Sequence, residues 1–281
     1  AIEINNAVNC GVKNCEILLT GSVGIRIMGD SLKCEVKNNY IHDIGDVAVA
    51  LEGYKNLAVI ANGYHEITNN KIVHIGRIVR HASAITVGNS DANKITHNYI
   101  ADVPRAGINL GGSIDSGIVG STIGQTLVNK NNRYEFMNCK ENYVAFNDIS
   151  NCMTDTQDCG VIYTSMTGVG NVIENNYLHN SQIYFSTGYG LYLDDGSSNY
   201  KIRNNIVADL QHEGKGLLSG VQMIKSRKNE LINNFYVDNR SDKCAIATEA
   251  KVADNHDEII FEKNIVSDCG RNLHGQFRWN N

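Results

Sequence analysis

Four aspartates in two neighbouring stretches of the chain have the side chains and the spacing for acid/base chemistry. Asp194 and Asp195 are adjacent and lead into a Gly-Ser-Ser turn, and Asp155 and Asp158 lie in the preceding repeat of the chain. Carboxylates that are brought together repel one another, which raises at least one pKa unless a cation compensates. Carboxyls with perturbed pKa values are the groups that proton transfer uses. Two adjacent aspartates can also be only a solvated turn, so both interpretations stand.

The partner of Asp194 depends on the path of the chain. Asp158 is expected to stack on residue 188, six positions before Asp194, so a straight strand would separate the two carboxylates by up to about 20 Å. They form a pair only if the chain bends sharply. Glu249 is the second candidate, because it is expected in the same column of side chains two rungs further on, about 10 Å away. The sequence leaves both pairs open.

A repeated pattern indicates the framework that positions these residues. The pattern is an asparagine, two strand-forming residues and a polar corner, as in NNYIHDIG from Asn38 and NNYLHNSQ from Asn175. Its key asparagines are Asn39, Asn70, Asn98, Asn147, Asn176, Asn205, Asn234 and Asn264. Their spacing is close to 29 residues, except for one interval of 49 residues. Such regularity is typical of a solenoid.

The short alternation of apolar residues favours strands over helices, as in Gly190-Leu191-Tyr192-Leu193. We therefore predict an all-β, right-handed parallel β-helix solenoid with three short strands per rung and about nine or ten rungs, at about 4.8 Å per rung. The asparagines are predicted to form a ladder at one corner, each amide bonding to the next and adopting a left-handed backbone conformation.

The domain prediction is a single β-helix over residues 1–281, truncated at both ends, with an inserted loop at residues 112–133.

A net charge of -5 and a pI near 6.0 argue against nucleic acid as a partner. No run of 18 apolar residues suggests a membrane span. The eight cysteines contain no CxxC pair, and stacked free thiols are favoured over disulfides. The oligomeric state stays open.

Aligning three segments on Gly160, Gly190 and Gly220, 30 residues apart, predicts which side chains share a face. It places Ile162, Tyr192 and Gln222 in one outward column, and Thr164, Asp194 and Ile224 in another. Aromatic rings on an outer face suit stacking on sugars. The predicted binding residues are Asp155, Tyr163, Tyr189, Tyr192, Gln222, Lys225 and Arg227. His81, Arg105, His179 and His212 are weaker candidates near loops, since a lone histidine at a corner is more often structural. No cofactor is predicted; calcium among the four aspartates would suit oxygen ligands, but no calcium-loop spacing supports it.

The segments Asp158-Cys-Gly-Val-Ile-Tyr163 and Gly190-Leu-Tyr-Leu-Asp-Asp-Gly-Ser-Ser198 resemble the parallel β-helix glycoside hydrolases. The nearest resemblance is to glycoside hydrolase family 141, which includes fucosidase and xylanase activities, and a more distant one is to the family 120 xylosidases. The resemblance implies a carbohydrate-active enzyme that works through paired carboxylates. It also implies that Asp158, Asp194 and Asp195 occupy catalytic positions.

Three classes of function follow. A glycoside hydrolase acting on a plant or algal polysaccharide would use one carboxyl as acid and another as nucleophile or base. A polysaccharide lyase would need a base and a cation that neutralises a uronate, with Lys225, Arg227, Tyr192 or His81 as candidates. A non-catalytic fibre, adhesin or tail-spike segment would have no carboxylate pair at catalytic separation. We expect a secreted, cell-surface or periplasmic location, although the eight cysteines leave the cytoplasm open.

Overall fold

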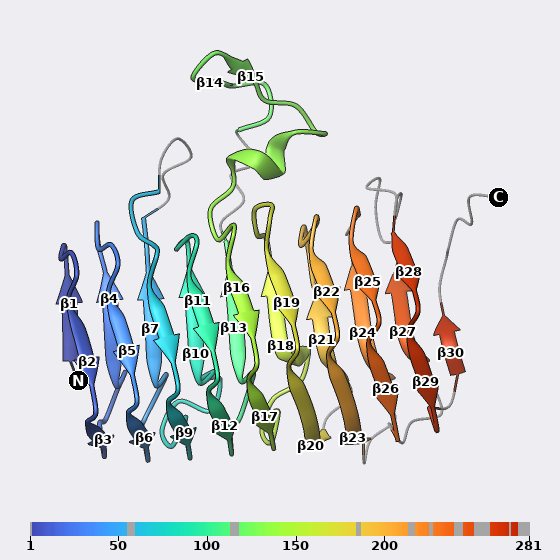
Figure 1. Ribbon diagram of the computed structural model, residues 1–281, viewed down its shortest axis with the longest axis horizontal. Coiled ribbons are helices and arrows are strands. Elements are labelled where there is room, and N and C mark those ends of the chain that lie inside the picture. Colours follow the sequence, from blue (N-terminus) through green and yellow to red (C-terminus); the bar gives the residue numbers. More distant parts are fainter. Residues whose placement is uncertain are drawn as a thin grey trace.

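The chain folds into a parallel β-helix whose rungs stack along one axis (Figure 1). The computed structural model describes residues 2–54, 60–112, 118–183, 187–212, 217–224, 227–238, 244–249, 259–269 and 271–274. Apart from one two-stranded hairpin, every strand in these ranges belongs to one of three parallel sheets, and none of the ranges contains an α-helix. The predicted fold class is confirmed.

Each rung contributes one strand to each sheet. The first sheet contains β1 (Ile2–Asn5), β4 (Ile25–Met28), β7 (Val49–Glu52), β10 (Ile85–Gly88), β13 (Ile108–Gly111), β18 (Cys159–Ser165), β21 (Thr187–Leu193), β24 (Leu217–Ile224), β27 (Cys244–Glu249) and β30 (Arg271–His274). The second contains β2 (Gly11–Lys13), β5 (Glu35–Lys37), β8 (Glu66–Thr68), β11 (Lys94–Thr96), β16 (Tyr143–Ala145), β19 (Val172–Glu174), β22 (Lys201–Arg203), β25 (Glu230–Ile232) and β28 (Ile260–Glu262). The third contains β3 (Glu16–Leu18), β6 (Tyr40–His42), β9 (Lys71–Val73), β12 (Tyr99–Ala101), β17 (Asp148–Ser150), β20 (Tyr177–Ile183), β23 (Ile206–His212), β26 (Phe235–Val237) and β29 (Ile265–Ser267).

The core is a set of stacked aliphatic side chains that point into the solenoid. In the third sheet the middle residues Ile41, Ile72, Ile100 and Ile149 are register partners on successive rungs, and all are fully buried. Each such isoleucine contributes about 1.5 to 3 kcal/mol through burial. The strands of the three sheets are short, so stability comes from stacking rung on rung.

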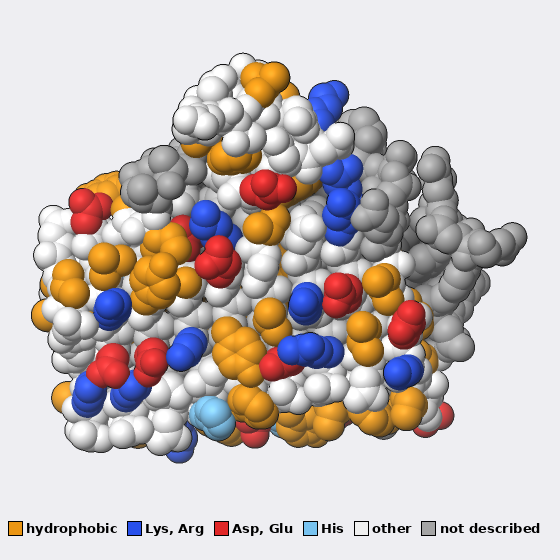
Figure 2. Space-filling view, turned by 45° about the horizontal axis from the view of Figure 1, so that its top comes forward, with side chains coloured by type: hydrophobic (Ala, Val, Ile, Leu, Met, Phe, Trp, Pro, Cys, Tyr) orange, Lys and Arg blue, Asp and Glu red, His pale blue; other side chains and the backbone are white. Residues whose placement is uncertain are grey.

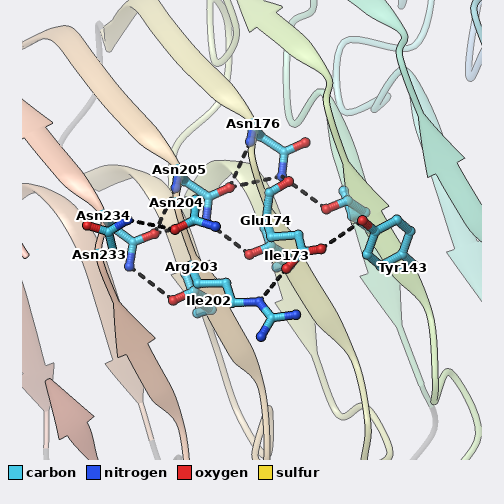
Figure 3. Close-up of polar contacts among 11 residues, drawn as sticks. Tyr143, Ile173, Glu174, Asn176, Ile202, Arg203, Asn204, Asn205, Asn233 and Asn234 are labelled. Carbon is cyan, nitrogen blue, oxygen red and sulfur yellow. Dashed lines mark hydrogen bonds and ion pairs between the residues drawn. The ribbon is translucent and has the colours of Figure 1, made fainter. Parts of the chain in front are cut away.

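The predicted asparagine ladder is present at the corner between the second and third sheets. Each ladder amide donates from Nδ2 to Oδ1 of the next asparagine, and the steps from Asn176 to Asn205 and from Asn205 to Asn234 both measure 3.0 Å (Figure 3). The same Oδ1 also accepts from the backbone N–H of the preceding ladder asparagine. The ladder therefore satisfies buried backbone donors at a corner where the sheet hydrogen bonds are interrupted.

The sequence predicts a left-handed backbone conformation for the ladder asparagines themselves. That prediction is wrong, because the residue before each ladder asparagine adopts this conformation. These preceding residues have φ between 55° and 58°, and they are Asn38, Asn69, His97, Phe146, Asn175, Asn204, Asn233 and Lys263. The outward position has room for side chains as different as His97 and Phe146, which stack on each other with centroids 5.0 Å apart. The ladder amide must point inward, so the bend falls one residue earlier.

A second ladder, which the sequence analysis missed, lies at the corner before the second sheet. Asn93 donates to Asn142 at 2.8 Å, and Asn142 donates to Asn171 at 3.1 Å. His65 extends the row: its backbone N–H donates to Asn93, and its Nδ1 accepts from the backbone of Cys34 at 3.0 Å. Burial lowers the pKa of His65 to about 4, so its imidazole is neutral near neutral pH.

The segment between β13 and β16 leaves the rungs and projects from the solenoid (Figure 1). It contains the short hairpin of β14 (Thr122–Ile123) and β15 (Thr126–Leu127) and the 3₁₀ helix η1 (Arg133–Phe136). Ile118, Val128, Tyr134 and Met137 form a small apolar cluster of its own. The projecting segment thus accounts for the one long interval between ladder asparagines.

Basic and acidic side chains are interspersed on the face shown in Figure 2. On the second sheet, Lys37 forms ion pairs with both Glu35 and Glu66 at 2.5 Å, and Lys13 also pairs with Glu35. No helix within the described part of the chain is long and apolar enough to cross a membrane.

The cysteines whose side chains are described are free thiols. Cys34, Cys139, Cys152 and Cys159 are buried. Burial raises the pKa of Cys159 to about 12, so this thiol is not ionised near neutral pH. The prediction of free thiols is confirmed for the described cysteines, whereas the side chain of Cys244 lies outside the described residues.

Candidate functional site

Three tyrosines form a cluster on β18 and β21, outside the main core. Tyr163 on β18 is the register partner of Tyr192 on β21. Their ring centroids lie 5.3 Å apart, and those of Tyr189 and Tyr192 lie 4.7 Å apart, both in edge-to-face arrangements. Tyr189 and Tyr192 are only 1% and 3% exposed. The cluster is therefore packed and holds its hydroxyl groups in fixed positions.

The register shows that the predicted columns were partly wrong. Tyr192 has Tyr163 and Gln222 as partners, not Ile162, and Ile162 is fully buried. Thr164 is also buried and pairs with Leu193 rather than Asp194. The register of β18 and β21 therefore differs by one position from an alignment of their glycines. A shift of one residue moves a side chain to the opposite face of a strand.

Asp194 lies at the end of β21 beside Tyr163, whose hydroxyl donates to its Oδ2 at 2.7 Å. The net effect of the surroundings is to raise the pKa of the Asp194 carboxyl. Burial is the largest cause, and the negative charges of Asp195 and Asp158 act in the same direction, against the hydrogen bond from Tyr163. Asp194 is thus a carboxyl that retains its proton to a higher pH than an exposed aspartate does.

Asp158 belongs to the same cluster despite its position at the start of β18. Its Oδ1 accepts from the hydroxyl of Tyr192 at 3.1 Å, and its charge contributes to the raised pKa of Asp194. The chain bends at this residue, where φ is +55°. The hydroxyl groups of the register partners Tyr163 and Tyr192 thus hold one carboxylate each.

Gly160 allows the two strands to come together at the site. A Cβ atom at this position would lie 2.6 Å from the carbonyl oxygen of Ile162 and 2.9 Å from Cβ of Tyr192. Contacts this short would force backbone to move. The absence of a side chain at Gly160 therefore lets Tyr192 lie over β18 and reach Asp158.

Both tyrosines that bond the carboxylates have pKa values well above the ordinary value for tyrosine. For Tyr163 burial is the largest cause, followed by its hydrogen bond to Asp194. For Tyr192 burial again comes first, and the charges of Asp194 and Asp158 follow. Near neutral pH both hydroxyl groups are protonated hydrogen-bond donors, which suits them to hold carboxylates and not to abstract protons.

Two other predicted residues lie in contacts with loops. Asp155 forms an ion pair at 2.5 Å with Arg80, which ties two loops together across 75 residues of sequence. Arg227 donates from Nη2 to the backbone and side-chain oxygens of Asn131 at 3.3 and 3.4 Å, so it contacts the projecting segment.

The remaining predicted residues are placed by backbone position. Asp195 follows Asp194, and its carbonyl accepts from the backbone of Met166 at 2.6 Å. Gln222 continues the Tyr163 and Tyr192 column. Leu193 is the register partner of Met223, so Ile224 occupies the position that corresponds to Asp194 on the next rung. Glu249 is the register partner of Ile224, so its backbone lies in the column of Asp194 two rungs further on. Lys225 lies outside the described residues.

Of the weaker candidates, Arg105 lies over the ring of Tyr163 and contacts His81. His179 pairs instead with Asp148, and the side chain of His212 lies outside the described residues. The guanidinium carbon of Arg105 is 5.3 Å from the centroid of the Tyr163 ring, and its Nη1 is 2.6 Å from Nε2 of His81. The pKa of His81 is lowered, first by burial and then by the charge of Arg105. The sequence offered no signal for this contact, because Arg105 and Tyr163 belong to different rungs that the projecting segment separates along the chain.

Among the described residues, no group of three or more histidine, cysteine or acidic side chains is arranged to hold a metal ion. The carboxylates of Asp194 and Asp158 bond to tyrosine hydroxyl groups, and that of Asp155 bonds to an arginine. Asp194 and Asp158 are thus the acidic groups that the structure brings together with the tyrosine cluster.

No protein-family model matches the sequence, and comparison with curated proteins found no match. Solved structures are similar in fold. A protein described as a glycoside hydrolase aligns over 95% of this chain and 38% of its own, with a TM-score of 0.60 and 18% identity. The A-module of the mannuronan C-5 epimerase AlgE6 of Azotobacter vinelandii aligns over 96% and 61%, with a TM-score of 0.67 and 10% identity.

The tailspike protein of Escherichia coli bacteriophage HK620, determined with a pentasaccharide, aligns over 95% of this chain and 45% of its own, with a TM-score of 0.57 and 11% identity. The descriptions of all three proteins name carbohydrate chemistry or a bound saccharide. At these identities the likeness shows the parallel β-helix fold alone. The chain spans 38% to 61% of the length of these structures.

Proposed function

We propose that this protein is a glycoside hydrolase in which Asp194 and Asp158 act as the carboxylate pair. The observation that carries the proposal is the four-residue cluster in which Tyr163 holds Asp194 and Tyr192 holds Asp158. Glycoside hydrolysis uses two carboxyl groups in different protonation states, placed on either side of the scissile bond. The charge of Asp158 acts on Asp194, and each carboxylate accepts a hydrogen bond from one tyrosine of a packed pair, which supports this assignment.

The environments of the two carboxylates suggest a division of roles. Asp194 is partly buried and has a raised pKa, which suits a general acid that protonates the leaving oxygen. Asp158 is exposed, so a water molecule or the sugar itself can approach it. It would serve as the nucleophile or as the base that activates water. Tyr163 is partly exposed, and the guanidinium group of Arg105 lies over its ring, so a sugar bound here would contact both side chains.

A polysaccharide lyase is the second candidate, and His81 is the observation that favours it. Its pKa is lowered, and a neutral imidazole can accept a proton from a sugar carbon once Nε2 is released from Arg105. Tyrosine is less suited to that role here, because the pKa values of Tyr163 and Tyr192 are raised. The carboxylates, not the imidazole, accept hydrogen bonds from the packed tyrosine cluster, so hydrolysis takes precedence.

A non-catalytic fibre or tail-spike segment would have no reason to bury a carboxyl beside two others on its outer face. The raised pKa of Asp194 costs folding free energy at neutral pH. Such a cost is common where a site needs a protonated acid. The resemblance to glycoside hydrolase family 141 agrees with the proposal, and action on an extracellular polysaccharide would place the protein outside the cytoplasm.

The test is incubation of the purified chain with a panel of plant and algal polysaccharides, followed by two readouts on the same samples. New reducing ends without unsaturated products support hydrolysis. Unsaturated products in proportion to the new ends would replace the proposal with a lyase. A panel without either product refutes an enzymatic function of this chain. Glu249→Gln beside Asp158→Asn then distinguishes the two possible partners of Asp194, since only the true partner abolishes turnover.

A further inference from the structure

Arg105 is held in place by backbone contacts from the next rung. The backbone N–H of Met153 donates to the carbonyl of Arg105 at 2.9 Å, and that of Asp155 donates to the carbonyl of Pro104 at 3.2 Å. The hydroxyl of Thr156 also donates to Pro104, at 2.9 Å. The loop that carries Arg105 is therefore fixed by three hydrogen bonds. Its guanidinium group starts from a defined position beside Tyr163.

The charge of Arg105 has no carboxylate partner within the part of the chain that the structure describes. Its contacts there are the ring of Tyr163 and Nε2 of His81. The neighbouring Arg80 differs, because it forms an ion pair with Asp155. Arg105 is partly buried, and a partly desolvated guanidinium group that faces no anion is available to bind one.

His81 adds a donor without adding charge. An arginine can only donate, so Nε2 of His81 must accept from Nη1 of Arg105, and the ring proton then lies on Nδ1. His81 is exposed, so this N–H can reach a ligand. Together the two side chains offer one positive charge and several N–H donors on one side of Tyr163, while Asp194 lies at its hydroxyl end.

We propose that Arg105 and His81 bind the carboxylate of a uronate residue that lies next to Tyr163, so that the substrate of this site is an acidic polysaccharide. The inference rests on the proposed hydrolase site for its location, whereas its evidence is the set of contacts that Arg105 makes. A planar guanidinium group matches a carboxylate with two parallel hydrogen bonds, whereas a neutral sugar offers hydroxyl groups that need no charge. The placement beside Tyr163 puts the acidic sugar next to the carboxylate pair.

The test measures binding and not turnover. Isothermal titration of the whole chain is carried out with oligogalacturonate, oligomannuronate and glucuronoxylan oligosaccharides, each beside its carboxyl-reduced form. A sulfated galactan without uronate provides a different anion. The variants are Arg105→Gln, Arg105→Lys and the control Lys94→Gln, which removes one positive charge from the exposed second sheet. Circular dichroism spectra verify that each variant folds.

The expected result is that at least one uronate oligosaccharide binds about tenfold or more tightly than its carboxyl-reduced form, the size of one charge-assisted hydrogen bond. Arg105→Gln removes that preference, Arg105→Lys retains part of it, and Lys94→Gln leaves it unchanged. Equal binding of the acidic and reduced forms overturns the inference. So does preference for the sulfated galactan alone, or an equal loss in Arg105→Gln and Lys94→Gln.

Failure of this inference and failure of the proposed hydrolysis are separable. Hydrolysis of a neutral polysaccharide with no preference for uronates would leave the carboxylate pair standing and remove the uronate subsite. Selective binding of uronates that depends on Arg105, without any product, would do the reverse.

Discussion

The interior of the asparagine ladder offers the sharpest test of what holds the solenoid together. Asn147→Ala removes five hydrogen bonds. The amide donates to the carbonyls of Ile95 and Ala145 and to Oδ1 of Asn176, and its Oδ1 accepts from the backbone and side-chain nitrogens of Asn98, all at 2.9 to 3.1 Å. Asn147 is 2% exposed, so water does not replace these bonds.

At about 1 kcal/mol for each bond the loss is about 5 kcal/mol. The side chain of Asn98 keeps its bond to the carbonyl of Ile67, so we expect a lower total of about 3 to 5 kcal/mol. The matched control is Asn39→Ala at the first step of the ladder. Asn39 donates to Val12 and Asn70, and accepts from the backbone of the exposed Cys15, so we expect about 1 to 2 kcal/mol.

The assay is urea unfolding of both variants beside the parent chain, followed by circular dichroism and tyrosine fluorescence. The free energy of unfolding should fall more for Asn147→Ala than for Asn39→Ala, by about 2 kcal/mol. Coincident transitions for the two probes would justify the two-state treatment, which long repeat arrays can violate. Equal losses in the two variants, or a loss below about 1 kcal/mol for Asn147→Ala, would refute the ladder as a main source of stability.

Three further predictions follow from single side chains. Gly160→Ala should lower the free energy of unfolding by about 1 to 3 kcal/mol, because its Cβ would meet β18 and Tyr192; an unchanged urea midpoint would contradict the close approach. Because the pKa of Asp194 is raised in the folded state, this carboxyl contributes its full stabilisation below about pH 4, and that contribution is lost as pH rises through the folded pKa. Asp194→Asn should therefore be more stable than the parent at pH 7. Thermal melts that show no gain would argue against a desolvated carboxyl. The pKa of His65 is about 4, so the parent loses stability as pH falls from about 6.5 towards 4; His65→Asn should reduce that loss, and identical acid unfolding of both chains would contradict the burial of a neutral imidazole.

The solenoid is predictable from the sequence because its ladder asparagines recur at nearly constant spacing and each has one physical task. The second ladder was also visible in principle. Asn93, Asn142 and Asn171 each precede a residue of the first ladder by five positions, but substitutions such as His65 interrupt the pattern. The position of the left-handed residue was not visible, since Asn-Asn pairs do not reveal which asparagine bends and which points inward.

The site was only partly predictable, and the reasons are geometric. Aligning β18 and β21 on Gly160 and Gly190 treated these glycines as register partners, whereas Gly160 pairs with Tyr189. The two glycines are not equivalent, because Gly160 is needed for the close approach of Tyr192. The ladder step from Asn147 to Asn176 was the better guide to register.

Asp158 and Asp194 were predicted as candidates, but their connection was not. It depends on a left-handed bend at Asp158 and on two tyrosine hydroxyl groups that reach in opposite directions along neighbouring strands. Arg105 joins the same cluster from the loop before β13, a contact that only the stacking of loops creates.

The measurement that tests the central claim most directly is the rate of reducing-end release by Asp194→Asn on the best polysaccharide of the panel. Asp148→Asn is the control, since Asp148 lies on the third sheet and pairs with His179. Removing a general acid costs about 10²-fold to 10⁴-fold in rate, so we expect Asp194→Asn to lose about 100-fold or more while Asp148→Asn retains the parent rate. Reducing ends released at the parent rate by folded Asp194→Asn would contradict the account.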